Sequence, residues 1–257
     1  MLRTISSFCA FLAVVALSAH PTHQKKFSPL TDKEAESVVC NLRKGGLPDL
    51  GSHFEIKTTD SGKTQKVSGK LFFKNIADAQ FLRIEIGDKV FLQNAQGAVT
   101  QELICPPYAF CADDVRLPFL LWDFKYLETR RVLGRNTHII RFSSTKGTAC
   151  GYSTIDVAYD PAFDAILQVE YLGLDKNNQL NKTDPITQNN LKVQRVFKLQ
   201  DFKKISGMWL MKSVEIFENN QTTTINFTEV ALNQILSDLL FLNTSPVNDA
   251  GLTFQKM

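Results

Sequence analysis

The sequence predicts a mainly β (α+β) domain built on a single antiparallel sheet that curves. From Leu50 onward, apolar and polar residues alternate with a period of two, which is typical of strands with one buried face. Gly, Pro, Asn and Asp separate these alternating segments at short, regular distances. A helical pattern precedes the first strand, and an apolar insertion interrupts the strands in mid-chain. No repeat or change of composition indicates a second domain after the N-terminal region.

Residues 31–44 are predicted to form a helix of about three turns. Thr31 or Asp32 can cap its N-terminus, and acidic residues occupy the first turn. An apolar stripe that includes Leu42 gives the helix one face to bury, and Gly45 ends it.

About ten strands are expected from the alternation. The segment 80–94 holds two of them, joined by a turn at Gly87 and Asp88. The alternating segments are 53–58, 66–75, 80–94, 125–134, 136–144, 152–160, 165–175, 191–202, 208–219 and 221–232.

Residues 102–124 interrupt this rhythm. The run from Leu117 to Trp122 is apolar on every side and does not alternate. It is too short to span a bilayer, which needs roughly 20 apolar residues. Asp113 and Asp114 could stand at the N-terminus of a helix. We therefore expect a loop-helix insertion that lies across the sheet.

The N-terminus predicts export. A cationic start at Arg3, an apolar run over residues 8–17 and small residues after it form the three parts of a secretory signal peptide. Cleavage is expected after Ser18 or Ala19, and an uncleaved membrane anchor is the alternative. The expected division is a signal peptide over 1–19, a linker over 20–30 and one domain over 31–257.

Four cysteines remain after removal of the signal peptide, and an even number in an exported chain favours disulfide bonds. Cys105 and Cys111 flank a short loop with two prolines, so a bridge between them is the first expectation. Cys40 with Cys150 is the remaining pair, which leaves no free thiol. A metal site is the rival interpretation, but the four histidines show no ligand spacing with these cysteines.

Signatures of catalysis are scarce. The sequence has no Gly-rich phosphate loop and no nucleophile elbow. His138 is interpreted as a strand residue rather than a base, and Asp160 and Asp164 as turn formers rather than an acid–base pair. The net charge is +3 without a basic block, which disfavours nucleic acid as a partner. We expect no enzyme activity, no cofactor and no metal.

Two later segments resemble a known family. Residues 154–180 run from a strand through an Asp-Pro turn into another strand and an Asn-rich hairpin, and residues 202–230 contain Gly207, Trp209 and Lys212 in a G-x-W-x-x-K strand. Together they resemble the outer-membrane lipoprotein-sorting proteins, the LolA/LolB-like periplasmic carriers. The resemblance covers most of residues 31–242. The sequence departs from the pattern in its C-P-P-Y-A-F-C loop, and no residue can be assigned to cargo release.

The resemblance implies an unclosed half-barrel whose concave apolar face is covered by helices and a loop. The space between would accept acyl chains, whose shielding from water is worth roughly 0.8 kcal/mol per CH₂ group. The apolar insertion would be a movable cover, with Pro118 allowing it to shift; plain core packing is the alternative. The residues expected to line the cavity are Phe54, Leu71, Phe73, Leu82, Ile84, Leu117, Phe119, Leu120, Leu121, Trp122 and Trp209.

The function implied is that of a soluble, monomeric, non-enzymatic carrier in the periplasm. It would shield acyl chains of lipoproteins or another lipid, between an inner-membrane transporter and an outer-membrane acceptor. The alternative is a lipid- or lipoprotein-sensing module on the same fold that regulates a partner. An exported hydrolase is a third, weaker interpretation.

Overall fold

The computed structural model describes residues 27–44, 49–76, 79–94, 97–98, 109–174, 191–242, 245–248 and 251–257. The expected signal peptide, most of the expected linker and Cys105 lie outside the described residues.

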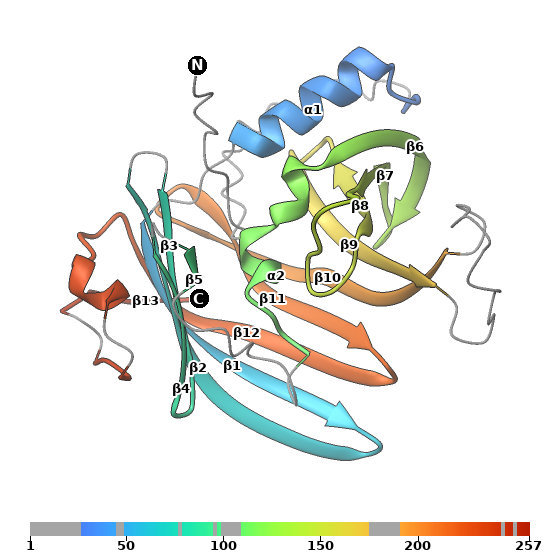
Figure 1. Ribbon diagram of the computed structural model, residues 1–257. Coiled ribbons are helices and arrows are strands. Elements are labelled where there is room, and N and C mark those ends of the chain that lie inside the picture. The colour runs from blue at the N-terminus through green and yellow to red at the C-terminus, as the bar shows by residue number, and fades with distance from the viewer. Residues whose placement is uncertain are drawn as a thin grey trace.

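One antiparallel sheet forms the body of the protein (Figure 1), which confirms the predicted fold class. Its strand order is β5-β4-β3-β2-β1-β12-β11-β10-β9-β8-β7-β6, with β13 paired to β12. In the described part of the chain the sheet does not close, because β5 and β6 stand at opposite ends of this order. The strands are β1 (Leu50–Asp60), β2 (Lys63–Ile76), β3 (Ala79–Ile86), β4 (Lys89–Asn94), β5 (Gly97–Ala98), β6 (Asp123–Val132), β7 (Arg135–Ser143), β8 (Thr154–Asp160), β9 (Ala165–Leu174), β10 (Leu191–Ile205), β11 (Met208–Glu218), β12 (Gln221–Leu232) and β13 (Gln255–Lys256).

Tight turns join neighbouring strands and set the twist of the sheet. In several two-residue turns both central residues have positive φ, the conformation that matches the right-handed twist of the flanking strands. Glycine or asparagine adopts this conformation at low cost. These turns are Ser61-Gly62, Leu133-Gly134, Ser206-Gly207 and Asn219-Asn220. The turns that the sequence predicts within 204–207 and 218–222 are therefore confirmed, and the turn predicted at 134–136 lies at 133–134.

Helix α1 (Asp32–Lys44) begins where the sequence predicts. The Thr31 hydroxyl accepts a hydrogen bond from the Glu34 backbone N–H, while the Glu34 carboxylate accepts from the Thr31 N–H at 2.8 Å. This reciprocal arrangement is a capping box. Ala35 and Val39 bury the apolar stripe of the helix.

The mid-chain insertion contains two short helical pieces rather than one helix. α2 (Asp113–Arg116) ends at Leu117, which has a φ of 45°, and the 3₁₀ helix η1 (Pro118–Leu121) follows. Proline lacks an N–H and clashes with the preceding turn, so Pro118 cannot continue α2 and instead begins the next piece.

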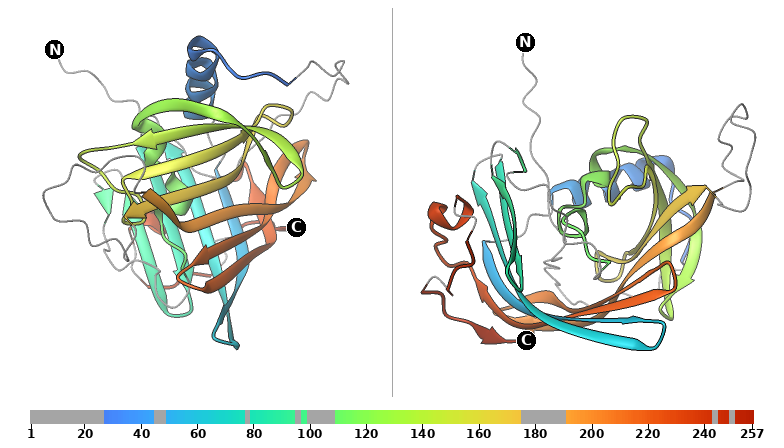
Figure 2. Two further views of the ribbon diagram at one scale, coloured as in Figure 1. Left: turned by 90° about the vertical axis from the view of Figure 1, so that its right-hand side faces the viewer. Right: turned by 60° about the horizontal axis from the view of Figure 1, so that its bottom comes forward.

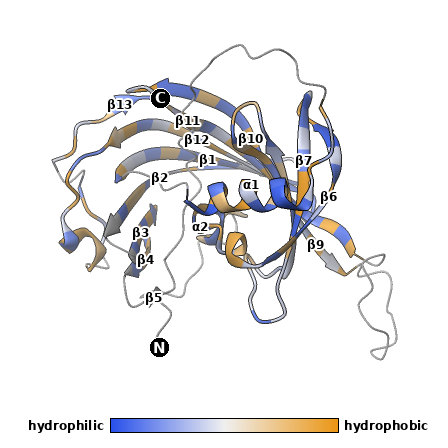
Figure 3. Ribbon diagram, turned by 90° about the horizontal axis from the view of Figure 1, so that it is seen from above, coloured by the Kyte–Doolittle hydropathy of each residue, from blue (hydrophilic) through white to orange (hydrophobic). Residues whose placement is uncertain are grey.

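The curved sheet carries different segments on its two faces (Figure 2). Helix α1 and the α2–η1 segment lie on the concave side, as seen from above in Figure 3. The main hydrophobic cluster lies there and includes side chains of the sheet, of α1 and of the insertion. The C-terminal segment, with η3 (Asp238–Phe241), lies on the outer side, where Leu240 and Phe241 form a second cluster with Phe72.

A buried arginine fixes this outer segment. The Arg83 side chain is fully buried, and its Nε donates to the Glu85 carboxylate at 2.5 Å. Its Nη1 donates to the Leu240 carbonyl at 2.9 Å, and its Nη2 donates to the Ser245 carbonyl. The ion pair thus satisfies carbonyl groups that irregular backbone would otherwise leave buried without partners.

Gly207 provides a test of the turn geometry. Gly207 has a φ of +87°, and a Cβ placed there meets no atom within 4 Å, so Gly207→Ala should cost only backbone strain. We expect a loss of about 1–2 kcal/mol in the free energy of unfolding, measured by urea denaturation. Gly147→Ala is the control, because its Cβ makes ordinary contacts and its φ lies outside the left-handed region. Equal effects of the two substitutions would contradict the assignment of the turn.

Candidate functional site

Residues 109–121, called the plug here, fill the interior of the curved sheet. Phe110 and Val115 are buried, and Phe110 meets the ring of Phe54 edge-on, with the ring centroids 6.2 Å apart. The cavity left between plug and sheet has a volume of about 10 Å³, enough for at most about one water molecule. Its lining residues are Leu71, Phe110, Asp114, Val115, Phe197, Met211, Val214, Ile225 and Phe227.

Most residues expected to line an acyl-chain cavity lie in the main hydrophobic cluster, some on the strands and some in the plug itself. They are Phe54, Leu71, Phe73, Leu82, Ile84, Leu117, Phe119 and Leu120. Trp122 packs against this cluster and meets the Phe119 ring edge-on. Leu121 differs, because its side chain is 49% exposed.

Trp209 lies elsewhere, in a pocket of about 360 Å³. The residues that line this pocket are Leu133, Arg135, Phe163, Ala165, Leu167, Leu199, Gln200, Asp201, Phe202 and Trp209. It is a second apolar recess: β10 and β11 contribute to both spaces, but none of its lining residues lines the small cavity beside the plug.

Side chains hold the described plug to the rest of the protein. From Cys111 to Trp122, the backbone hydrogen bonds of α2 and η1 run within the segment itself, for example from Leu117 N–H to the Asp113 carbonyl at 2.9 Å. Arg43 of α1 donates to the Leu120 carbonyl at 2.6 Å and to the Trp122 carbonyl at 3.0 Å. The segment therefore packs on the sheet without extending its ladder of strands.

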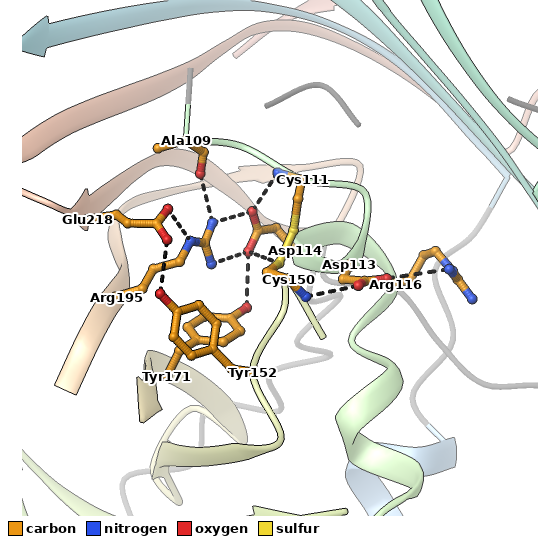
Figure 4. The surroundings of a disulfide bond; sticks show 10 residues. All are labelled: Ala109, Cys111, Asp113, Asp114, Arg116, Cys150, Tyr152, Tyr171, Arg195 and Glu218. Atoms are coloured by element: carbon orange, nitrogen blue, oxygen red, sulfur yellow. Dashed lines mark hydrogen bonds and ion pairs between the residues drawn. A yellow bond between two sulfur atoms is a disulfide. The ribbon is translucent and has the colours of Figure 1, made fainter. Parts of the chain in front are cut away.

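A buried ion pair joins the plug to the sheet (Figure 4). The Arg195 guanidinium of β10 donates to both carboxylate oxygens of Asp114, at 2.7 and 2.5 Å, and to the Ala109 carbonyl at 2.9 Å. Both residues are only 1% exposed. Such a bidentate pair is strong in a dry environment, but it must first offset the desolvation of both charges.

Neighbouring strands complete this polar cluster. Arg195 lies opposite Tyr171 of β9 and Glu218 of β11 in the strand register. The Tyr171 hydroxyl donates to Asp114 at 3.0 Å, and the Arg195 guanidinium lies over the Tyr171 ring at 4.6 Å. Glu218 contacts Arg195 Nε at 3.3 Å and accepts from the Tyr152 hydroxyl at 3.0 Å.

The cluster shifts the acidity of its members. Burial, together with the Asp114 charge, raises the pKa of Tyr171 well above its usual value, so the hydroxyl stays protonated and donates. Burial is the larger cause and the charge of Glu218 the second; together they raise the pKa of Tyr152 to about 12. Burial alone would lower the pKa of Arg195, but the Asp114 carboxylate raises it, so the guanidinium remains charged.

A disulfide bond ties the plug to the loop between β7 and β8. Cys111 is bonded to Cys150, so the predicted Cys105–Cys111 and Cys40–Cys150 pairs are wrong. Cys40 is a free thiol on α1. The fold brings Cys111 and Cys150 together because the β7–β8 loop returns beside α2, where the Cys150 N–H donates to the Asp113 carboxylate at 3.0 Å.

Cys111, Asp113 and Cys150 place their ligand atoms within 4.8 Å of one another. In the disulfide-bonded state the two sulfurs are bonded to each other and offer no thiolate to a metal ion.

The residues considered for acid–base chemistry have structural partners. His138 is buried between Phe27 and Tyr126, with the Phe27 ring centroid at 4.5 Å, and burial lowers the pKa of His138. Asp160 accepts from the Ala162 N–H, and Asp164 accepts from the Tyr159 hydroxyl at 2.6 Å. Both aspartates stabilise the β8–β9 turn, which confirms their interpretation as turn formers.

Comparison with known proteins identifies the fold. No protein-family model matches the sequence, and no curated protein is significantly similar to it. Among solved structures, an outer-membrane lipoprotein-sorting protein domain from Vibrio parahaemolyticus superposes with a TM-score of 0.57 at 13% identity, covering 79% of this chain and 94% of that one. The chain has a LolA-like fold.

Two further structures agree with this assignment. A LolA superfamily protein from Nitrosomonas europaea gives a TM-score of 0.51 at 7% identity, covering 76% of this chain and 90% of that one. A DUF1329 family protein from Desulfovibrio piger gives 0.62 at 14% identity, covering 81% and 96%. At these sequence identities, the similarity to LolA-like structures establishes the fold alone, and a proposal about function must rest on the candidate site.

Among the described residues, no helix has the length and apolar character needed to cross a membrane.

The sequence analysis missed Arg195 and gave Asp114 only a role at a helix end. A signal for Arg195 exists: it stands two residues before Phe197 and four before Leu199, both of which point into the core. A charged residue in the apolar phase of a strand predicts a buried partner.

Mapping the disulfide tests the tether. Non-reducing proteolysis and mass spectrometry should yield a cross-linked pair of peptides containing Cys111 and Cys150. Cys111→Ala/Cys150→Ala should lower the free energy of unfolding by about 2–4 kcal/mol, because the bond closes a 39-residue separation. Cys40→Ala is the control and should leave the cross-link intact. A Cys105–Cys111 peptide would contradict the tether.

The buried ion pair can be tested by a double-mutant cycle. Asp114→Leu and Arg195→Met should each lower the free energy of unfolding by about 3–5 kcal/mol, because each leaves the charge of the other residue buried and unpaired. Asp114→Leu/Arg195→Met should cost markedly less, since it removes both charges. Asp201→Ala breaks the exposed pair with Lys212 and should cost less than about 1 kcal/mol. Additive effects at positions 114 and 195 would refute the pairing.

Proposed function

We propose that this protein is a non-enzymatic periplasmic carrier that shields acyl chains inside its curved sheet. One observation carries the proposal: a separate segment, the plug, occupies the apolar concave face and is held there by side chains. Acyl chains could take the place of Phe110 and Val115 against the wall of the sheet without breaking a single strand pairing. Ligand pockets typically have volumes of about 300–1,000 Å³, so the plug must move for a lipid to bind.

The fold supports this role. The similar solved structures include one described as a lipoprotein-sorting protein domain. The proposed cargo is a lipoprotein or another lipid, passed from an inner-membrane transporter toward an outer-membrane acceptor by a soluble monomer. Residues 1–19 would direct export, 20–30 would form a linker and 31–257 the carrier domain. The disulfide suits an oxidising compartment.

A sensing module is the second candidate, favoured by the covalent tether. A plug that stays attached through Cys111 and Cys150 would offer a new surface to a partner when a lipid displaces it. A carrier delivers its lipid to a second membrane, whereas a sensor retains it.

Acyl-chain binding tests the proposal. The delipidated protein should bind a fluorescent acyl probe, and Cys111→Ala/Cys150→Ala should bind it more tightly at a temperature where both proteins are folded. The reason is that loss of the tether favours the displaced plug and so raises the fraction of binding-competent protein.

Leu133→Asp is the control. Leu133 is 45% exposed and lines the pocket that contains Trp209, so the added charge should spare both stability and probe binding. Loss of binding in this variant would move the site to that pocket and contradict the proposal. Absence of probe binding to any form would also refute it. Transfer of the probe from donor to acceptor vesicles separates the carrier from the sensor, which would bind without transfer.

A further inference from the structure

The interior of the sheet contains a buried ion pair that a segment serving only to fill the core would not require. Replacing a buried ion pair by apolar residues is often neutral or stabilising, so packing alone does not account for Arg195 and Asp114. The positive partner belongs to the wall, on β10, while the negative partner belongs to the plug. When the plug moves, Asp114 leaves with it and Arg195 stays.

The wall then presents a defined set of donors. Arg195 Nη1 and Nη2 and the Tyr171 hydroxyl all converge on the Asp114 carboxylate (Figure 4). Glu218 does not replace that carboxylate, because it meets Arg195 at Nε and also accepts from Tyr152. Departure of the plug leaves three donors directed at one oxyanion position, and a buried guanidinium fork matches a carboxylate or phosphate.

Apolar surface adjoins this position directly. Phe110 and Val115 flank Asp114 along the plug and fill the space lined by Phe197 and Phe227, among others. A molecule that replaces the plug therefore meets donors at one end and apolar wall along the rest. That combination fits an amphiphile with an anionic head and an acyl tail.

We propose that the interior binds an amphiphile with a single anionic head group, with the head group on Arg195 and Tyr171, and that Asp114 is its built-in competitor. This inference rests on the proposed function and narrows the class of its ligand. The shared chemistry is an oxyanion that accepts two parallel N–H groups, supplied either by the carboxylate of a fatty acid or by the phosphate of a phospholipid. The Cys111–Cys150 bond keeps the competitor near its site, so Asp114 returns to Arg195 when the ligand leaves.

Matched probes test the proposal. The measurement is the affinity of the full-length mature protein for a fluorescent polyene fatty acid, for its methyl ester and for a monoacyl glycerol phosphate. Wild-type protein should prefer both anionic probes over the ester by at least about tenfold, because each can replace the Asp114 carboxylate. The two anionic probes separate a carboxylate source from a phosphate source.

Two variants locate the interaction. Asp114→Asn should raise the affinity for all three probes, because the plug loses its charge pair with Arg195 and the binding-competent fraction rises, and it should keep the preference for the anionic probes over the ester. Asp114→Leu/Arg195→Met should bind the ester and lose the preference for anions. The double variant removes both charges of this pair and leaves neither partner unpaired, so its comparison with wild type decides the question even where Asp114→Asn does not fold.

The outcomes separate the two proposals. Equal affinity of wild type for acid and ester, or an anion preference that survives in Asp114→Leu/Arg195→Met, would overturn this inference and leave the acyl carrier standing. Failure of all three probes to bind would overturn the proposed function, and this inference with it.

Discussion

The buried pair of Asp114 and Arg195 determines how the interior of this protein is arranged. It places a charge of the wall opposite a charge of the plug at the centre of an otherwise apolar face. Because an unpaired charge there would be costly, the plug has one favourable position, with its carboxylate on the guanidinium. The positions of Phe110 and Val115, and hence the closure of the cavity, follow from that position.

A strongly curved, unclosed sheet has two faces that must be covered, and on each face a buried arginine holds the segment that covers it. Arg195 on the concave side and Arg83 on the convex side are fully buried, and each donates to a carboxylate and to at least one backbone carbonyl of an irregular segment. The two attachments differ in one respect. Glu85 is on the same strand as Arg83, whereas Asp114 belongs to the plug itself. The ion pair on the outer face therefore persists if the segment detaches, while the inner pair is broken by any movement of the plug.

The sheet could be predicted from sequence because alternation and turn residues are local signals. Each strand pairs mostly with its neighbour in the chain, and the residues of turns such as Ser206-Gly207 set the hairpins directly. The helix at 32–44 was likewise predictable from its capping residues. The disulfide was not, because its pairing depends on where the β7–β8 loop lies relative to α2, which is a property of the whole fold. Proximity in sequence favoured Cys105 for Cys111, and the curvature of the sheet brought Cys150 there instead.

The same difference between local signals and properties of the whole fold applies to the candidate site. The apolar run at 117–122 could be recognised as unusual, and most of it belongs to the plug and lies in the core. The polar centre of the site could be recognised only in part: the apolar phase of β10 predicts that Arg195 is buried with a partner, but it does not identify that partner as Asp114, which is 81 residues away.

Hydrogen exchange of the plug, with and without a bound acyl ligand, tests the central claim most directly. In the oxidised, ligand-free protein, the hydrogen-bonded amides of 111–121, among them those of residues 114–117 and 120, should exchange slowly, and so should those of β11 and β12, because they donate within buried structure. Saturation with the fatty acid should accelerate exchange in 111–121 while β11 and β12 remain protected. Unchanged or slower exchange in 111–121 at full occupancy would show that the plug stays in place, and would contradict the claim that the ligand replaces it.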